Sequence, residues 1–180
     1  MCEAGESIEI QRSDTLRCEC PPDDLLIQWA VAGLRGAGPQ GAGPQESALQ
    51  GAGLKRVAGD GAGALTIRIV DEAEIRACNN QWRGKDKATN VLSFAAEFPA
   101  EAGVDYLGDM MVCAAVVMRE SEEQGKPLNN HWAHIVVHGV LHLRGFDHEN
   151  AQDAEIMEQR EKEILATLGV ADPYRDDIDS

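Results

Sequence analysis

Positive charge is scarce in this sequence. Its 180 residues contain 16 Lys and Arg against 31 Asp and Glu, which gives a formal net charge of −15 at pH 7. Nonspecific coating of nucleic acid requires clustered Lys and Arg that neutralise phosphates, so the composition argues against that function. A local basic patch is still compatible with the composition, because many of the acidic residues lie after His148.

Long apolar runs and paired cysteines are also missing. The longest apolar run, from Met110 to Met118, is far shorter than the roughly 20 residues that span a bilayer. The N-terminus has no basic stretch followed by an apolar segment, which a secretion signal would need. The five cysteines are an odd number without a C-x-x-C pair, which favours reduced thiols over a disulfide framework. We therefore expect a cytoplasmic protein without a membrane partner.

The length and the 43% of hydrophobic residues suit a single domain over residues 1–180. One stretch, residues 33–63, lacks regular apolar periodicity and repeats the tripeptide Gly-Ala-Gly. Such a composition buries little apolar surface to offset the entropy of ordering the chain. We expect a flexible Gly/Ala-rich insertion there, with a short helix near residues 46–57.

The rest of the chain alternates between strand and helix patterns. Strands are predicted at residues 8–10, 65–70, 89–94 and 106–112. Helices are predicted at residues 25–32, 71–82, 114–125, 130–144 and 151–168. Asp71 with Glu74 forms an acidic variant of the capping box at the second of these helices. The pattern indicates an α+β domain with a small mixed β-sheet covered by helices.

Three histidines in the segment from residue 138 to residue 148 have the spacing of metal ligands. His138 and His142 lie four residues apart on a predicted helix, so they point to the same side, one turn apart. Gly145 lets the backbone turn and bring His148 to the same point. Three histidines plus water form the open arrangement of catalytic zinc sites, whereas structural sites usually have four protein ligands. The sequence predicts one zinc ion per chain, used for hydrolysis.

A glutamate is absent where a metallopeptidase would carry its general base. The spacing matches H-E-x-x-H-x-x-G-x-x-H, but the position of the Glu is occupied by Gly139. Peptidase chemistry is therefore not supported, because general-base catalysis contributes on the order of 10²–10⁴-fold. His134, His138 and His142 form a less favourable set, since ligands on one straight helix spread over about 12 Å. We expect His131 and His134 to support the site or to pack.

The sequence resembles the bacterial YbeY family in three segments. These are His138 to His148, the run Asn79-Asn-Gln-Trp-Arg-Gly-Lys-Asp-Lys-Ala-Thr-Asn-Val-Leu-Ser-Phe94, and Leu107-Gly-Asp-Met110. The resemblance covers residues 65–174, and the insertion departs from it. It implies a single-strand-specific, metal-dependent endoribonuclease of 16S ribosomal RNA 3′-end maturation and ribosome quality control. By the same resemblance, zinc falls on His138, His142 and His148, and a functionally important arginine falls on Arg83.

The resemblance also implies partners: ribosomal RNA, the small ribosomal subunit, and ribosomal proteins or an assembly GTPase. The residues agree with RNA as substrate, because Arg83, Lys85 and Lys87 place three cations beside one acid, Asp86. A guanidinium can grip two phosphate oxygens as charge develops in a phosphoryl-transfer transition state. Taken alone, a run this short favours an ordinary solvated loop, and only its occurrence together with the histidine motif reverses that preference.

Other polar residues near these motifs have open roles. Asn90 and Ser93 could contact RNA or could form strand-end hydrogen bonds. Asp109 could be a turn residue, Asp147 could orient an imidazole, and both are candidate general bases beside a metal hydroxide. We therefore expect an endoribonuclease in which metal-activated water attacks a phosphodiester and Arg83 stabilises the added charge. The alternatives are a non-catalytic ribosome-assembly factor with a structural zinc, which the acidic surface favours, and a metallopeptidase.

Overall fold

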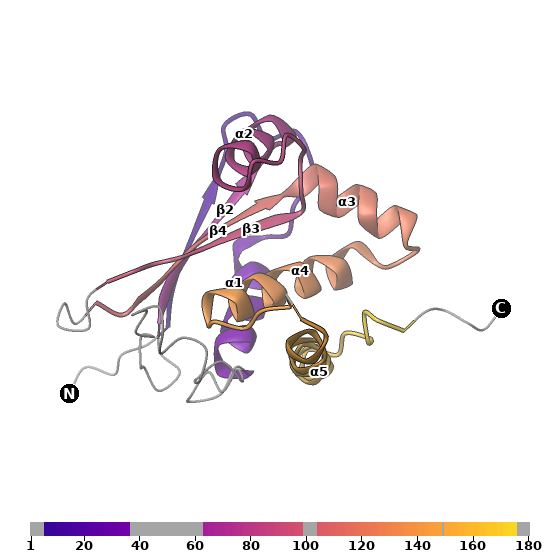
Figure 1. The fold of residues 1–180 in the computed structure, drawn as a ribbon. Coiled ribbons are helices and arrows are strands. Elements are labelled where there is room, and N and C mark those ends of the chain that lie inside the picture. Colours follow the sequence, from indigo (N-terminus) through magenta and orange to yellow (C-terminus); the bar gives the residue numbers. More distant parts are fainter. Residues whose placement is uncertain (1–5, 37–62, 99–103, 149, 176–180) are drawn as a thin grey trace.

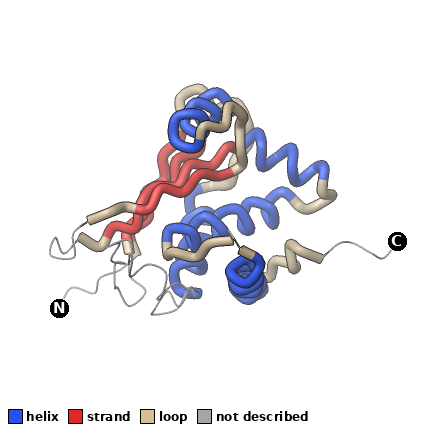
Figure 2. Tube along the Cα trace, in the orientation of Figure 1, coloured by secondary structure: helices blue, strands red, loops and turns tan. Residues whose placement is uncertain are grey.

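A mixed four-stranded sheet forms the framework of the molecule (Figures 1 and 2). The computed structural model describes residues 6–36, 63–98, 104–148 and 150–175. The strands are β1 (Ser7–Arg12), β2 (Ala64–Val70), β3 (Val91–Ala95) and β4 (Tyr106–Cys113). They lie in the order β1-β2-β4-β3, in which β1, β2 and β4 are parallel and β3 runs antiparallel to β4. β3 is therefore an edge strand.

Five helices accompany the sheet in the described residues. They are α1 (Asp23–Gly36), α2 (Glu72–Arg83), α3 (Ala114–Glu123), α4 (Leu128–Leu143) and α5 (Ala151–Thr167). Asp71 caps α2 by accepting a hydrogen bond from the Glu74 amide, as the capping pattern predicts. Asn150 caps α5 in the same way by accepting from the Asp153 amide.

The two faces of the sheet pack against different helices, because successive strand residues point to opposite sides. On β4, Met110 and Val112 join the larger core, which includes residues of α1, α4 and α5. Met111 and Cys113 join a smaller core with Ile75 of α2 and with α3. Figure 1 shows this division, with α2 on one side of the sheet and α1, α4 and α5 on the other.

The predicted fold class is confirmed: the sheet is mixed, open and flanked by helices. α1 continues through Gly36, so the helix extends into the stretch that was assigned to the insertion from residue 33. The rest of that stretch, with the helix predicted near residues 46–57, lies outside the described residues. None of the described helices is long and apolar enough to cross a membrane.

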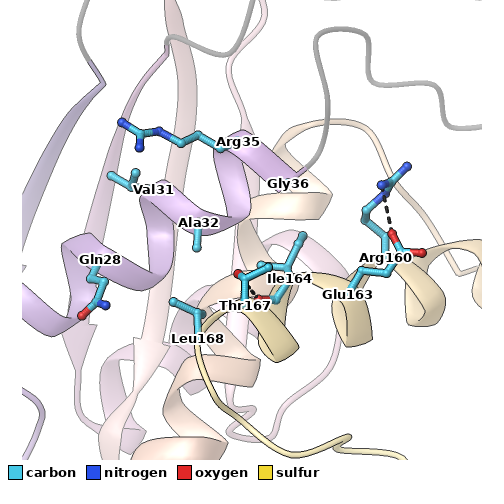
Figure 3. Close-up of a pocket in the computed structure, with 10 residues that line it drawn as sticks. All are labelled: Gln28, Val31, Ala32, Arg35, Gly36, Arg160, Glu163, Ile164, Thr167 and Leu168. Carbon is cyan, nitrogen blue, oxygen red and sulfur yellow. Dashed lines mark hydrogen bonds and ion pairs between the residues drawn. The ribbon is translucent and has the colours of Figure 1, made fainter.

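A hollow of about 510 Å³ lies between α1 and α5 (Figure 3). Its lining includes apolar side chains such as Val31 and Ile164 and the ion pair of Arg160 with Glu163. No predicted site residue lines it. The candidate site therefore lies elsewhere, on the side of α4.

Candidate metal centre

The histidine helix α4 packs closely on the sheet through Gly139. A Cβ atom at Gly139 would lie 2.0 Å from the Met110 sulfur and 3.3 Å from the Ser93 hydroxyl. The Ser93 hydroxyl donates to the Gly139 carbonyl at 3.1 Å. Gly139 thus faces the sheet and not the neighbouring imidazoles. This packing gives a physical reason why the metallopeptidase glutamate is absent from this position.

The turn after α4 brings the third histidine to the first two. Gly145 adopts a φ of 87°, in the left-handed region that favours glycine. The buried Phe146 fixes the turn, because its amide donates to the Leu141 carbonyl at 3.0 Å. Potential ligand atoms of His138, His142 and His148 all lie within 4.8 Å of one another. The three residues predicted from their spacing are therefore brought together.

Hydrogen bonds fix which imidazole nitrogens are available for a metal. His142 donates its Nδ1 proton to the Phe146 carbonyl at 3.0 Å, and His138 donates its Nδ1 proton to the Glu161 carboxylate at 2.6 Å. An imidazole that carries a single proton, on Nδ1, has a lone pair on Nε2. These two Nε2 atoms face each other at 3.1 Å, and two lone pairs at that distance repel each other unless a cation lies between them.

The donor set fits a metal ion such as zinc. Two nitrogens bound tetrahedrally at 2.0–2.1 Å from one zinc ion lie about 3.3 Å apart, close to the observed separation of the Nε2 atoms. Burial, together with the neighbouring His138 and His148, lowers the pKa of His142 to about 4. His142 is therefore neutral at pH 7, as a metal ligand must be. His148 is exposed, which leaves one side of the group accessible to solvent.

The two other histidines of α4 contact carboxylates. His131 Nε2 lies 2.9 Å from Glu120 on α3, and His134 Nε2 lies 3.1 Å from Glu161 on α5. His134, His138 and Glu161 form a second group whose potential ligand atoms lie close together. Glu161 was missed from the sequence, because it lies on a separate helix whose charged pattern resembles an ordinary solvated face.

The basic loop that follows α2, residues 84–87, is held by its own hydrogen bonds to that helix. Gly84 ends the helix with a φ of 65°, and its amide donates to carbonyls of the last turn. The buried Asn79 side chain donates to the Lys87 carbonyl at 2.8 Å, and the Asn79 backbone carbonyl accepts from the Lys85 amide at 3.3 Å. The loop after Arg83 is thus tied to α2 by its backbone.

The charges of this loop are not balanced locally. Asp86 forms a bidentate pair with Arg76, at 2.7 and 2.9 Å. Arg83, Lys85 and Lys87 are exposed, and none of them makes an ion pair within the described residues. The one acid of the predicted basic run is therefore occupied, while its three cations face solvent.

Asn90 and Ser93 make hydrogen bonds within the protein. The Asn90 amide donates to Glu120 at 3.1 Å, and its side-chain oxygen accepts from the Val91 amide. The Ser93 hydroxyl donates to α4, as described above. Both side chains position the edge strand β3, and their proposed contacts with RNA stay predictions.

The edge strand β3 lies between the basic loop and the histidine helix. Ser93 contacts α4 on one face of the sheet. The next residue, Phe94, makes an edge-to-face contact with Trp82 of α2, with ring centroids 6.0 Å apart. The helices α4 and α2 thus contact neighbouring residues of the same strand, from opposite faces of the sheet. Trp82 is 65% exposed and was missed from the sequence, because only its exposure in the fold distinguishes it from a core aromatic residue.

The two candidate general bases have backbone or surface partners. Asp147 accepts a hydrogen bond from the His148 amide at 2.7 Å, so it bonds the backbone of the turn. Asp109 accepts from the Tyr106 hydroxyl at 2.7 Å. Neither aspartate has a hydrogen bond to an imidazole of the described site. The assignment of a general base stays open.

A mixed sheet with three histidines gathered on one helix and its following turn defines an α+β protein with a candidate three-histidine metal centre. The family model described as Endoribonuclease YbeY matches residues 46–169, which include part of the predicted insertion. The chain belongs to the YbeY family of endoribonucleases.

Relatives and a solved structure agree with this assignment. The Endoribonuclease YbeY of Alkalilimnicola ehrlichii is 50% identical over 161 residues, which cover 87% of this chain and 94% of that protein. The Endoribonuclease YbeY of Halorhodospira halophila is 59% identical over 118 residues, 63% of this chain and 76% of that protein. The solution structure of TM1509 from Thermotoga maritima has a TM-score of 0.50 at 22% identity and covers 93% of this chain and 99% of that one. This last similarity concerns the fold alone.

Proposed function

We propose that this protein is a metal-dependent endoribonuclease specific for single-stranded RNA. Membership of the YbeY family supports an endoribonuclease. The observation that carries the metal dependence is the pair of Nε2 atoms of His138 and His142, which face each other at 3.1 Å beside the exposed His148. The physiological RNA in this proposal is the 3′ end of 16S ribosomal RNA, cleaved during maturation and ribosome quality control in the cytoplasm.

His138, His142 and His148 are the proposed ligands of one zinc ion. When bound, zinc supplies Lewis acidity toward water and phosphoryl oxygens. The protein's own contribution is to orient the imidazoles, because the Glu161 carboxylate and the Phe146 carbonyl accept from Nδ1 of His138 and of His142 and leave each Nε2 free to bind a metal ion. The exposed side of His148 gives RNA access to the centre.

The exposed cations near the edge strand are the proposed RNA contacts. In this proposal Arg83 donates to phosphate oxygens in the transition state, and Lys85 and Lys87 neutralise neighbouring phosphates. Trp82 adds an exposed aromatic face next to these cations. An aromatic face beside positive charge is the usual means of holding unpaired bases, because stacking on it requires a base outside a duplex. This combination supports the preference for single strands.

Two alternatives fit the site less well. A structural zinc usually has four protein ligands, and in the described part of the chain the group contains three. A metallopeptidase would need a glutamate at position 139. Met110 and Ser93 of the sheet already occupy the space that its side chain would take. The acidic composition suits docking on basic ribosomal proteins, so the small ribosomal subunit, its proteins and an assembly GTPase are proposed as partners of the enzyme.

The proposal is tested by offering three substrates to the same zinc-loaded preparation. These are a single-stranded RNA, the same RNA annealed to its complement, and casein. We expect cleavage of the single strand alone, and its loss in His142→Ala. Cleavage of casein would favour a peptidase, and binding of ribosomal subunits without RNA cleavage would favour the assembly factor with a structural zinc.

A further inference from the structure

The carboxylate of Glu161 is completely buried and lies at the interface of α5 with α4. Three side chains donate to it: His138 through Nδ1 at 2.6 Å, His134 through Nε2 at 3.1 Å, and the Tyr174 hydroxyl. A buried carboxylate is unfavourable unless hydrogen bonds and charges compensate for the lost hydration. The convergence of three donors on one buried carboxylate calls for an explanation beyond packing.

The position of His138 suggests this explanation, because His138 belongs to two groups of potential ligands. One group joins it with His142 and His148, and the other joins it with His134 and Glu161. The two ring nitrogens of an imidazole point in different directions, and His138 uses a different nitrogen toward each group. One nitrogen can bind a metal ion while the other donates its proton to a carboxylate.

The surroundings of the two groups decide which one holds the metal. Around Glu161, each carboxylate oxygen already accepts a hydrogen bond, and its exposed fraction of 0% leaves no route for a substrate. The group with His148 reaches the surface and includes the facing Nε2 lone pairs. Glu161 is thus suited to hydrogen bonding and not to ligation.

We infer that Glu161 is a positioning residue, which holds the proton of His138 on Nδ1 and directs the Nε2 lone pair toward His142 and His148. The inference rests on the proposed function of these three histidines as metal ligands. A carboxylate that accepts the proton on the other ring nitrogen of a ligating imidazole also makes that imidazole a more basic metal ligand. Removal of such partners typically weakens metal binding 10- to 100-fold.

Tyr174 extends this network to the segment that follows α5. Its hydroxyl donates to Glu161, and its ring lies beside His134, with centroids 5.5 Å apart. Lys126 donates at 2.6 Å to the carbonyl of Pro173, the residue before Tyr174, which ties the segment to the turn between α3 and α4. Tyr174 therefore holds one oxygen of the Glu161 carboxylate. Removal of the Tyr174 hydroxyl should weaken the positioning of His138 and leave the charge of Glu161 in place.

The test measures zinc affinity by competition with a chromophoric chelator, using the full chain. We expect Glu161→Gln to bind zinc roughly 10- to 100-fold more weakly than the wild type, and Tyr174→Phe to show a smaller loss. Glu163→Gln is the matched control, because Glu163 lies on the same helix, is exposed and pairs with Arg160. Its zinc affinity should equal that of the wild type. Thermal unfolding followed by circular dichroism identifies any variant that fails to fold.

A second measurement needs no variant at position 161 and so does not depend on its folding. In the metal-free wild type at pH 8, ¹⁵N chemical shifts of the His138 ring should show a proton on Nδ1 and none on Nε2. A proton on Nε2 would overturn the inference. Wild-type zinc affinity in a folded Glu161→Gln variant would also overturn it, as would two bound zinc ions in the wild type of which one is lost in Glu161→Gln. Failure of the protein to cleave RNA would refute the proposed function and leave these binding results unaffected.

Discussion

Two exposed side chains at the end of α2, Trp82 and Arg83, define the RNA side of the proposed site. They are adjacent in sequence, and Trp82 contacts Phe94 of the edge strand, but the proposed function gives them different roles. A guanidinium acts on the charge that develops at phosphorus, whereas an indole ring acts on the bound base. Their substitution should therefore affect turnover and binding separately.

Arg83→Ala should lower kcat for RNA cleavage by roughly 10²–10³-fold, the usual effect of losing one donor to a transition-state oxyanion, with a small change in KM. Steady-state kinetics on a single-stranded RNA measures both constants. The control is Arg119→Ala, which removes an exposed arginine of α3 that pairs with Glu72. If KM rises while kcat stays constant, Arg83 only docks a phosphate.

Trp82→Ala should weaken binding of single-stranded RNA by roughly 1–3 kcal/mol, the typical contribution of one stacked base. Trp82→Phe keeps an aromatic face and should retain most of the affinity. Fluorescence anisotropy with a labelled oligonucleotide measures the two dissociation constants. Equal affinity of the alanine variant and the wild type would remove Trp82 from the RNA contact.

Individual residues differ in how far the sequence identifies them. The three histidines are predictable, because helix periodicity and one glycine turn bring them together within a short segment. Glu161 is not, since its contact with His138 depends on how α5 packs against α4. Asn90 is ambiguous for a similar reason: its partner, Glu120, lies on a helix whose position the sequence pattern leaves open.

At the scale of elements, the packing of α4 on the sheet places the histidines. The helices and strands themselves are predictable from periodicity and from caps such as Asp71, because these signals are local. The order of the strands is not, since β4 inserts between β2 and β3, and its pairing with β2 joins residues far apart in the sequence, such as Ile67 and Met110. The close approach at Gly139 likewise became visible only in the structure.

Gly139→Ala tests this approach. Alanine favours a helix over glycine by about 1 kcal/mol, but overpacking of a tight interface typically costs about 1–3 kcal/mol. Because the Met110 sulfur lies 2.0 Å from the added Cβ and Met110 is completely buried, we expect a net loss of stability. Urea denaturation of the variant and of the wild type measures the difference in their free energies of unfolding.

The double variant Gly139→Ala, Met110→Ala supplies the control for this prediction. Met110→Ala alone leaves a cavity, and the methyl group added at position 139 would occupy part of it. The two losses should therefore sum to more than the loss measured in the double variant. A Gly139→Ala protein as stable as the wild type would show that α4 can move away from the sheet at little cost.

At the scale of the whole molecule, metal binding should stabilise the fold. The ligands come from α4 and its following turn, and Glu161 links them to α5, so the site joins segments that separate on unfolding. A ligand that binds only the native state adds about 2.7 kcal/mol at a concentration 100 times its dissociation constant. We expect zinc to raise the Tm of the metal-free wild type and to leave that of His142→Ala nearly unchanged. An equal rise in both proteins would place the stabilising ion at another site.

The proposed function requires that the three histidines form the metal centre that cleaves RNA. Its most direct test is to remove metal from the wild type with a chelator, and then to measure cleavage of a single-stranded RNA while zinc is added back. We predict that activity is absent without metal, rises linearly with added zinc and levels off at about one equivalent per chain. Full cleavage by the metal-free protein, or restoration of activity in a variant with His138, His142 and His148 all changed to Ala, would contradict the account.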